Sequence, residues 1–246
     1  ETSFAYLDRS YTQINYNSWN PSLPIYRDDT YNTPYKGIRE ANYFMQNVHK
    51  CPPEELNDVD KGYYYNEARF LRAHFYAMML PVYGPVFLIG DDPVDFTQSG
   101  LDQRERNTWD ECVNYVANEL WEAAKGLPDS WPDIYYGRAT KGAALAARAR
   151  LLLYAASPLV NGNPDYIGFN NPDGTPLMST TYDPEKWKRA LDAAAAAIAL
   201  ADEINPDTKK PKYDLYTSAD SSLPDDERGR KDYHDTFVEE PWNGAE

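Results

Sequence analysis

The chain has 246 residues, of which 42% are hydrophobic, enough to build one large domain or two modest ones. Its formal net charge of -15 argues against nucleic acids and anionic membrane surfaces as partners, because binding to either draws on Lys and Arg side chains. No apolar run approaches the roughly 18 residues that a membrane-spanning helix needs. A folded, acidic globular protein is therefore expected.

Aromatic residues make up 14% of the chain, and 21 Tyr and 6 Trp far outnumber the 8 Phe. Tyr and Trp rings carry a hydroxyl or an indole N–H, which suits them to a boundary between protein and water. This composition fits a surface that binds amphipathic ligands, although most of the rings are expected to serve packing.

The two cysteines, Cys51 and Cys112, are too few for a disulfide framework, and their spacing matches no metal-binding pattern. One bridge and two free thiols are both compatible with the sequence. The chain begins at Glu1 without a signal-like segment, which we interpret as a mature or trimmed chain.

The first 34 residues are rich in aromatic rings but show no sustained periodicity, which predicts irregular structure. A first helix is then predicted, with Thr33 as its N-cap and Cys51-Pro52-Pro53 beyond its end. Its apolar face is expected to consist of Ile38, Ala41, Met45 and Val48.

A second helix is predicted from about Asp58 to Leu80, with Pro81 and then Gly84-Pro85 as its terminators. Its charged residues are expected on the flanks, solvated or paired with neighbouring helices; they are Glu67, Arg69 and Arg72. The predicted buried stripe consists of Ala68, Leu71, Phe75, Met78 and Met79. The short apolar run 86–89 predicts an extended segment across helix ends.

A capping box, Thr108-Trp109-Asp110-Glu111, predicts the start of a third helix, and Gly126-Leu127-Pro128 predicts its end. The predicted buried stripe is Trp109, Val113, Val116 and Leu120. A fourth helix is expected to open at Gly137-Arg138-Ala139-Thr140 and to stop at Ser157-Pro158. It is rich in Ala, which allows a neighbouring helix to approach closely.

A fifth helix is predicted between Asp183-Pro184 and Asn205-Pro206. Its expected apolar stripe is Trp187, Leu191, Ala194, Ile198 and Ala201. The insertions between helices, around 91–106, 128–138 and 158–182, are where specialised contacts are expected. The stretch 225–231 is interpreted as a solvated loop.

One helix carries the most distinctive pattern of the chain. It reads Asn66-Glu67-Ala68-Arg69-Phe70-Leu71-Arg72-Ala73-His74-Phe75-Tyr76 and is followed by Tyr83-Gly84-Pro85-Val86. This helix resembles the signature helix of the SusD/RagB family of outer-membrane nutrient-binding lipoproteins. Further segments resemble the family in the same order: Tyr35-Lys36-Gly37-Ile38-Arg39-Glu40-Ala41-Asn42, Gly137-Arg138-Ala139-Thr140-Lys141-Gly142, 147–159 and Tyr182-Asp183-Pro184-Glu185-Lys186-Trp187.

The resemblance covers roughly 35–200 and implies an all-α fold of tetratricopeptide-like helical repeats with long irregular loops. Three parts follow: an irregular segment at 1–34, the helical domain at 35–205, and a loop-rich tail at 206–246 that leads toward a C-terminal half. The resemblance further implies a lipid-anchored receptor on the outer surface of the outer membrane. Its partner would be a SusC-like TonB-dependent transporter, docked against the helical face.

The candidate carbohydrate-binding residues lie before the first helix. Stacking on sugar rings calls for flat aromatic faces, and sugar hydroxyls call for amides and a guanidinium nearby. The chosen residues are Trp19, Asn20, Tyr26, Arg27 and Tyr31. The competing interpretation is that Trp19 and Tyr31 brace the first helix pair.

Catalysis finds little support in the sequence. There is no Gly-rich phosphate loop, Gly-x-Ser-x-Gly elbow or His-Glu-x-x-His motif, and we expect neither a cofactor nor a metal. Adjacent acids such as Asp91-Asp92 could serve glycoside hydrolysis but are expected in so acidic a chain. Asn170-Asn171-Pro172-Asp173-Gly174 resembles a calcium loop, but a plain turn is favoured. A glycan receptor is the preferred function; a peptide-capturing relative and a tetratricopeptide-type interaction scaffold are the alternatives.

Overall fold

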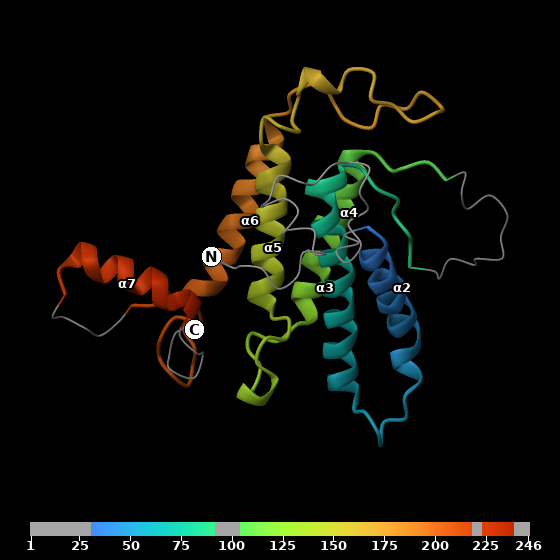
Figure 1. The fold of residues 1–246 in the computed structure, drawn as a ribbon. Helices are drawn as coiled ribbons and strands as arrows, with labels where there is room; N and C mark the ends of the chain where they lie inside the picture. The colour runs from blue at the N-terminus through green and yellow to red at the C-terminus, as the bar shows by residue number, and fades with distance from the viewer. Residues whose placement is uncertain (1–30, 92–103, 218–222, 239–246) are drawn as a thin grey trace, which may run out of the picture.

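A computed structural model describes residues 31–91, 104–217 and 223–238. Within these residues the regular elements are six α-helices and short 3-10 turns, joined by loops that contain two isolated β-bridges. The helices are α2 (Asn32–Asn47), α3 (Asp58–Tyr83), α4 (Trp109–Gly126), α5 (Lys141–Ala156), α6 (Glu185–Asp202) and α7 (Asp225–Val238). From α2 to α6, each helix packs against the next one and runs in the opposite direction (Figure 1). The predicted all-α class is confirmed.

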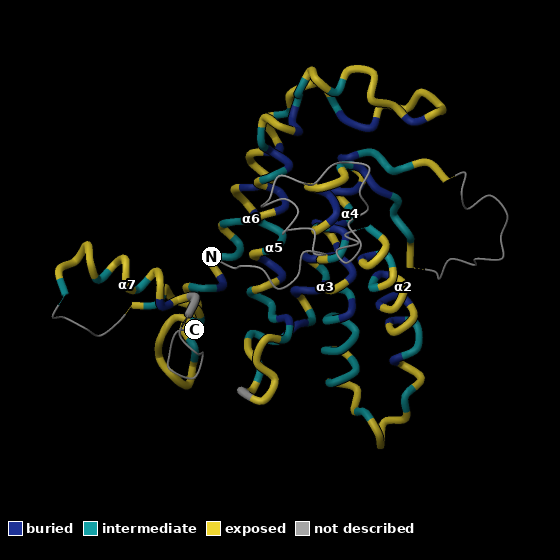
Figure 2. The backbone as a smooth tube through the Cα atoms, in the orientation of Figure 1, coloured by how far each residue is buried: buried dark blue, intermediate teal, exposed yellow. Residues whose placement is uncertain are grey.

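The core lies between the helices of this array, whose inner faces are buried while the loops are exposed (Figure 2). Its largest fully buried apolar side chains include Trp109, Tyr76, Met79 and Leu120. A smaller cluster, which includes Leu127, Leu145 and Leu200, lies where α4 ends and α5 begins. All four residues of the predicted α4 stripe are buried, so the apolar period of this helix was read correctly.

Two helix starts have the predicted caps. Thr108 accepts a hydrogen bond from the Glu111 N–H, and Glu111 accepts one from the Thr108 N–H, which completes the capping box of α4. The Thr108 N–H bond lowers the pKa of the Glu111 carboxyl. Thr140 caps α5 by accepting from the Ala143 N–H.

The predicted cap of α2 is wrong. The helix begins at Asn32 with Tyr31 in the N-cap position, and no side chain caps it. Thr33 therefore lies inside the first turn, where its hydroxyl cannot take the N-cap role.

The predicted end of α3 is also wrong, because the helix continues through Pro81 to Tyr83. A proline removes one backbone hydrogen bond, and so close to a helix end little of the helix remains to be disrupted. The terminator is Gly84, which adopts a φ of +68° and whose N–H bonds to the Leu80 carbonyl.

The predicted stripe of α3 matches the buried face only in part, with Ala68 and Met79 buried, and the predicted stripe of α6 does not match it. On α3, Leu71 and Met78 are exposed while Arg72 is buried. On α6, three predicted stripe residues are exposed: Trp187, Leu191 and Ile198. The face of α6 that meets α5 is built from small residues, including Ala190 and Ala193, because these allow the two helices to approach closely.

The stretch expected as a solvated loop at 225–231 belongs to α7, which lies to one side of the array (Figure 1). Ion pairs between successive turns support this helix: Arg228 with Asp225, Arg230 with Asp226, and Lys231 with Asp235.

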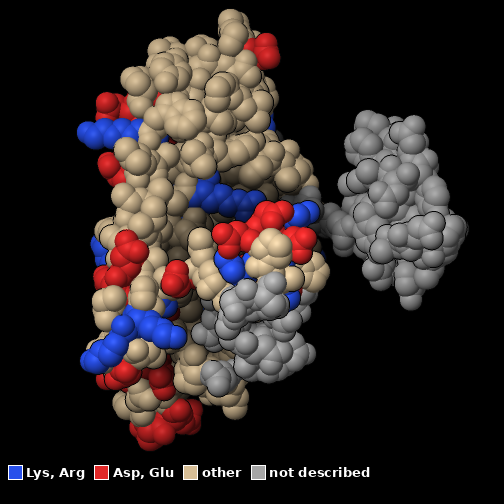
Figure 3. Space-filling view, turned by 90° about the vertical axis from the view of Figure 1, so that its left-hand side faces the viewer, with Lys and Arg blue, Asp and Glu red and all other residues tan. Residues whose placement is uncertain are grey.

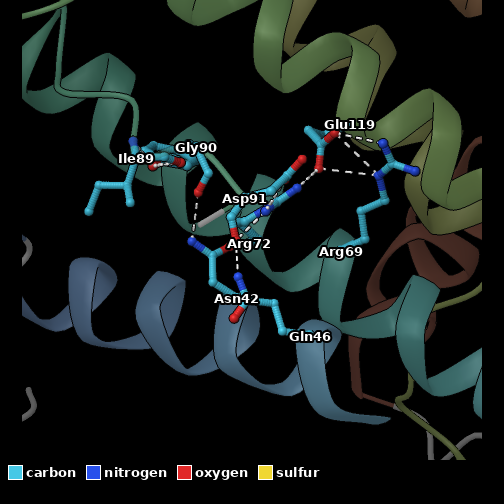
Figure 4. A network of polar contacts seen from close by, with 9 residues as sticks. Asn42, Gln46, Arg69, Arg72, Ile89, Gly90, Asp91 and Glu119 are labelled. Atoms are coloured by element: carbon cyan, nitrogen blue, oxygen red, sulfur yellow. Dashed lines mark hydrogen bonds and ion pairs between the residues drawn. The ribbon is translucent and has the colours of Figure 1, made fainter. Parts of the chain in front are cut away.

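A buried ion pair joins the centre of the array (Figure 4). Arg72 on α3 is 1% exposed, and its guanidinium pairs with the Glu119 carboxylate on α4. Arg69 donates to the same carboxylate, with Nη2 2.8 Å from Oε1. Burial opposes the charged form of Arg72, but the hydrogen bond and charge of Glu119 outweigh it and raise the pKa of the guanidinium.

The same guanidinium reaches two further parts of the fold. Its Nη1 donates to the Asn42 side-chain oxygen on α2 at 2.6 Å and lies 2.7 Å from the Asp91 carboxylate. Asn42 in turn donates to the Gly90 carbonyl at 2.9 Å. Of the two predicted environments for Arg72, solvation or pairing with a neighbouring helix, the structure therefore shows pairing.

A second ion pair between helical elements lies near the end of the array where α3 and α5 begin. Arg138, just before α5, pairs with Glu67 on α3, with Nη2 2.5 Å from Oε2. Its guanidinium also lies 3.9 Å from the centroid of the Trp131 ring. Of the two environments predicted for Glu67, solvation or pairing with a neighbouring element, the structure therefore shows pairing.

Cys51 and Cys112 are free thiols, which resolves the two alternatives left open by the sequence. Burial raises the pKa of Cys112 to about 11. None of the helices in the described ranges has the length and apolar character needed to cross a membrane.

The buried pair generates a stability prediction. Glu119→Ala should cost about 3 kcal/mol of unfolding free energy, because it leaves Arg72 charged and buried without its main partner. Urea unfolding followed by circular dichroism measures this loss. Glu122→Ala, one turn away in a solvent-exposed pair with Lys125, is the control and should have little effect. Equal losses for both variants would contradict the account.

The capping pattern generates a second stability prediction. Thr108→Ala should lower the unfolding free energy by about 1 kcal/mol, because it removes a hydroxyl that satisfies a helix-terminal N–H. Thr33→Ala should change it far less, since Thr33 is exposed and no side chain caps α2. Thermal unfolding of both variants measures the difference. A larger loss of unfolding free energy for Thr33→Ala than for Thr108→Ala would show that Thr33 caps α2 after all.

Candidate functional site

The long connections gather at one end of the array, where α2, α4 and α6 begin and α3 and α5 end (Figure 1). We call this region the loop end and define it as Tyr31 with residues 84–91, 104–108 and 157–184. Backbone hydrogen bonds join its segments: the Asn107 N–H bonds to the Val86 carbonyl and the Trp109 N–H to the Leu177 carbonyl. Segments far apart in sequence are thus brought together on one surface.

Tyr31 is the one predicted binding residue within the described ranges. Its half-buried ring meets the rings of Tyr35 and Tyr83 edge-on, with centroids 5.1 Å apart in both cases. It therefore touches both helices of the first pair, as the bracing interpretation expects, while lying at the loop end. Trp19, Asn20, Tyr26 and Arg27 lie outside the described residues, and their binding role stays a prediction.

The segment 84–91 crosses the helix ends in an extended path, as predicted. Two tyrosines, half-buried Tyr35 and buried Tyr76, hold it: the Tyr35 hydroxyl donates to the Phe87 carbonyl at 2.8 Å, and the Tyr76 hydroxyl accepts from the Ile89 N–H at 2.8 Å. Burial raises the pKa of both tyrosines, which are neutral at physiological pH in any case. The neutral hydroxyls hold the segment rigidly against α2 and α3.

The connection between α5 and α6 is long but well anchored at its base. Asn161 is buried, and its side chain donates to the Asp183 carbonyl and accepts from the Asp183 N–H, both at 2.9 Å. Gly162 adopts a φ of +79°, and a Cβ there would lie 2.6 Å from the backbone of Tyr182. The backbones of Gly162 and Tyr182 are therefore in contact at the base of the connection, and a residue with a Cβ at position 162 would clash.

The outer part of this connection is anchored as well. Residues 169–177 fold back on themselves, with the Leu177 N–H bonded to the Phe169 carbonyl and an isolated bridge between Asn170 and Pro176. Leu177 is fully buried, and the Asn171 amide donates to the Arg106 carbonyl at 2.8 Å. Long loops with internal structure of this kind are commonly functional.

The turn inside this segment is the plain turn that was favoured over a calcium loop. Asp173 accepts from the backbone N–H and the hydroxyl of Thr175, at 2.7 and 2.8 Å. These bonds lower the pKa of the Asp173 carboxyl and occupy it. Across the described ranges there is no group of three or more His, Cys, Asp or Glu side chains that could hold a metal ion.

The surface of the α5–α6 connection differs from the rest of this acidic chain. Among the 26 residues of 157–182 the acidic and basic ones are Asp165 and Asp173 alone, although 26% of the whole chain is charged. Figure 3 shows this region, at the top of the molecule, as almost uncharged surface. Its exposed apolar side chains are Leu159, Ile167, Phe169 and Tyr182.

One groove lies away from the loop end, between α2 and α3. Its volume is about 470 Å³, and its lining includes Gly37, Phe44, Leu71 and Phe75. The lining is mainly apolar; its polar side chains are Glu40, Tyr64 and Glu67, and Glu67 is already paired with Arg138. This groove fits protein contacts better than carbohydrate.

The side chains considered for catalysis are dispersed or occupied. His49, His74 and His234 lie on three different helical segments. His74 stacks on Phe70, with ring centroids 5.9 Å apart, and burial lowers its pKa. Asp91 is paired with Arg72, and its neighbour Asp92 lies outside the described residues.

Sequence reasoning pointed to 158–182 as a place of specialised contacts but proposed none of its residues for ligand binding. Ile167 and Phe169 belong to no recognised motif, and Tyr182 entered only as the first residue of a segment that resembles the family. The shortage of charged residues in this stretch, within so acidic a chain, was the signal that could have found them.

Comparison with known proteins gives a consistent result. Residues 2–153 match the family model SusD-like_3, described as starch-binding and associating with the outer membrane. No curated protein matches the chain. The solved structure of BT4246 is 31% identical, with a TM-score of 0.66, over 82% of this chain and 36% of its own.

Two further solved structures share the fold. A SusD-like protein (BF3747) from Bacteroides fragilis NCTC 9343 is 23% identical, with a TM-score of 0.56, over 88% of this chain and 35% of its own. A laminarin-binding SusD-like protein is 17% identical, with a TM-score of 0.54, over 79% of this chain and 34% of its own. The chain thus spans about a third of the length of these three proteins.

The base of the α5–α6 connection generates a prediction. Gly162→Ala should destabilise the loop more than Gly168→Ala, because both glycines have φ near +80° but only Gly162 faces the backbone of Tyr182. The strain common to both should cost about 1–2 kcal/mol. Limited proteolysis of residues 157–184 measures the difference as a faster cleavage rate, and equal rates for the two variants would show that the close contact does not hold the loop.

Proposed function

We propose a carbohydrate-binding function for this protein, because the chain belongs to the SusD-like family, whose description is starch-binding and associating with the outer membrane. The observation that carries the proposal is the loop end, where segments from five helix termini form one anchored surface with exposed rings and amides. Sugar binding needs these groups, and they must be held in place before the ligand arrives.

The loop end supplies both requirements. Tyr31, Phe169 and Tyr182 provide aromatic rings, while the exposed amide of Asn170 and the hydroxyl of Thr180 can exchange hydrogen bonds with sugar hydroxyls. The predicted residues Trp19, Asn20, Tyr26 and Arg27 precede Tyr31 directly and are proposed to complete this surface. The laminarin binding stated for one protein of the same fold agrees with a glycan ligand.

The proposal extends to location and partner. We place the protein at the outer surface of the outer membrane, held by a lipid anchor, where it delivers glycan to a SusC-like TonB-dependent transporter. The helical faces offer room for such a partner. The α2–α3 groove and the exposed Trp187, Leu191 and Ile198 of α6 present apolar surface away from the loop end.

Binding without chemistry is the expected mode of action. The proposed role needs capture and release of an intact ligand, and two carboxylates of the loop end already accept backbone hydrogen bonds: Asp173 from the Thr175 N–H, and Asp183 from the Glu185 N–H. We therefore propose a receptor and not an enzyme.

Two alternatives are open to the same measurements. A peptide-capturing member of the family would bind oligopeptides selectively and no glycan. A tetratricopeptide-type scaffold would bind a protein partner through the helical faces, and the apolar α2–α3 groove is the feature that favours it.

Retention in native gels that contain single polysaccharides tests the proposal. One glycan should retard the protein, and Trp19→Ala or Tyr31→Ala should weaken the retardation while leaving the helical circular-dichroism signal unchanged. Tyr43→Ala is the matched control, because Tyr43 is 66% exposed on α2 and belongs to no part of the loop end. Retardation by no glycan, together with selective binding of an oligopeptide or protein, would overturn the proposal.

A further inference from the structure

The 157–182 surface combines a low charge with exposed rings, and this combination bears on the kind of glycan that is bound. Tyr182 is 57% exposed and Ile167 76% exposed. Exposure of such apolar groups to water is unfavourable. Covering them with the apolar face of a sugar ring removes them from water and lowers the free energy. Exposed apolar groups on an anchored loop are therefore suited to a ligand.

The polar groups of this surface are mostly neutral. Asn170, Thr180 and Thr181 are exposed, and their amide and hydroxyl groups can both donate and accept hydrogen bonds. Groups of this kind match sugar hydroxyls. They would not compensate the desolvation of a carboxylate or a sulfate, which requires cationic partners.

The cations nearest to this surface lie beside it and not within it: Arg104 is exposed on the neighbouring 104–108 segment, and two others are held in contacts. Lys186, at the start of α6, is buried and pairs with Asp110 at 2.5 Å. Arg106 lies over the Phe169 ring, with its guanidinium carbon 5.0 Å from the ring centroid. The two charged residues of the surface itself, Asp165 and Asp173, are acidic, and the chain as a whole carries a net charge of -15. Residues 157–182 themselves offer an anionic polymer no cation, and the net negative charge of the chain repels it at long range.

We propose that residues 157–182 form a saccharide-contacting face of the loop end and that this face selects uncharged glycans over glycans that carry uronic acids or sulfates. The inference rests on the proposed carbohydrate-binding function and adds the ligand class and the contact residues. The rings of Phe169 and Tyr182 provide stacking, and the neutral composition provides the selection.

The structure also explains why this face is ready to bind. The Asn161–Asp183 bonds close its base, buried Leu177 fixes its outer turn, and the Asp173 N–H bonds to the Glu105 carboxylate at 3.1 Å. A ligand therefore meets a surface that is already ordered, which reduces the entropy cost of binding.

The first experiment compares neutral and anionic polysaccharides by affinity gel electrophoresis. Starch, laminarin and xyloglucan are the neutral probes; polygalacturonate, alginate and chondroitin sulfate are the anionic ones. Retardation by at least one neutral probe and by none of the anionic probes is expected. Preference for an anionic probe would overturn the inference while leaving the carbohydrate-binding function intact, and no retardation by any probe would overturn both.

The second experiment places the contact. Tyr182→Ala should weaken retardation by the neutral probe about tenfold, because a stacking ring is lost. Tyr43→Ala, with an exposed ring outside the loop end, should have no effect. Limited proteolysis confirms that the loop remains folded in each variant. Unchanged affinity of a folded Tyr182→Ala variant that also carries Phe169→Ala would place the contact elsewhere and overturn the inference.

A third variant tests the selection directly. Thr180→Lys combined with Thr181→Lys adds two cations to the exposed face without removing a ring. Retardation by polygalacturonate should appear in this variant and should fade as salt is added, because the new attraction is electrostatic. If polygalacturonate does not retard this variant, the lack of positive charge on this face is not what excludes anionic glycans, and the inference is overturned.

Discussion

The buried ion pair between Arg72 and Glu119 is the interaction on which the rest of the structure depends. One guanidinium joins α3 to α4 through Glu119, to α2 through Asn42, and to the 84–91 segment through Asp91 (Figure 4). A buried charge is costly unless it is paired, so these contacts favour the packing in which the Arg72 guanidinium keeps its three partners. The position of the loop end follows, because the 84–91 segment carries the 104–108 segment and the α5–α6 connection with it.

The array also separates two kinds of surface. At the loop end, residues 157–182 present rings, amides and hydroxyls with little charge, which suits a sugar. Along the helices, the α2–α3 groove is mainly apolar and α6 exposes Trp187, Leu191 and Ile198, which suits a protein. A receptor that passes its ligand to a transporter needs both surfaces at once, and this fold keeps them apart on one rigid body of helices.

Local signals in the sequence predicted most of the fold. Thr108 and Thr140 were placed correctly as caps, because capping depends on residues within one helical turn. Tertiary contacts decided the failures. Arg72 can be buried because it pairs with Glu119, a partner 47 positions away in the chain that no local pattern reveals. On α6, Ala190 is buried instead of Leu191, because a small residue lets α5 approach closely. At the loop end, Tyr31 was proposed for binding from its place in an aromatic-rich segment, whereas the exposure of Ile167, Phe169 and Tyr182 depends on a loop conformation that no local pattern specifies.

The central claim is that a rigid array of helices holds the loop end ready to bind an uncharged glycan. Amide hydrogen exchange in the presence and absence of a neutral oligosaccharide tests it most directly, because it reports every backbone segment at once. The account predicts slower exchange at 157–184 and around Tyr31, with no change at 128–138, which lie at the opposite end of the array. Protection confined to 128–138 or to the α2–α3 groove would contradict the account.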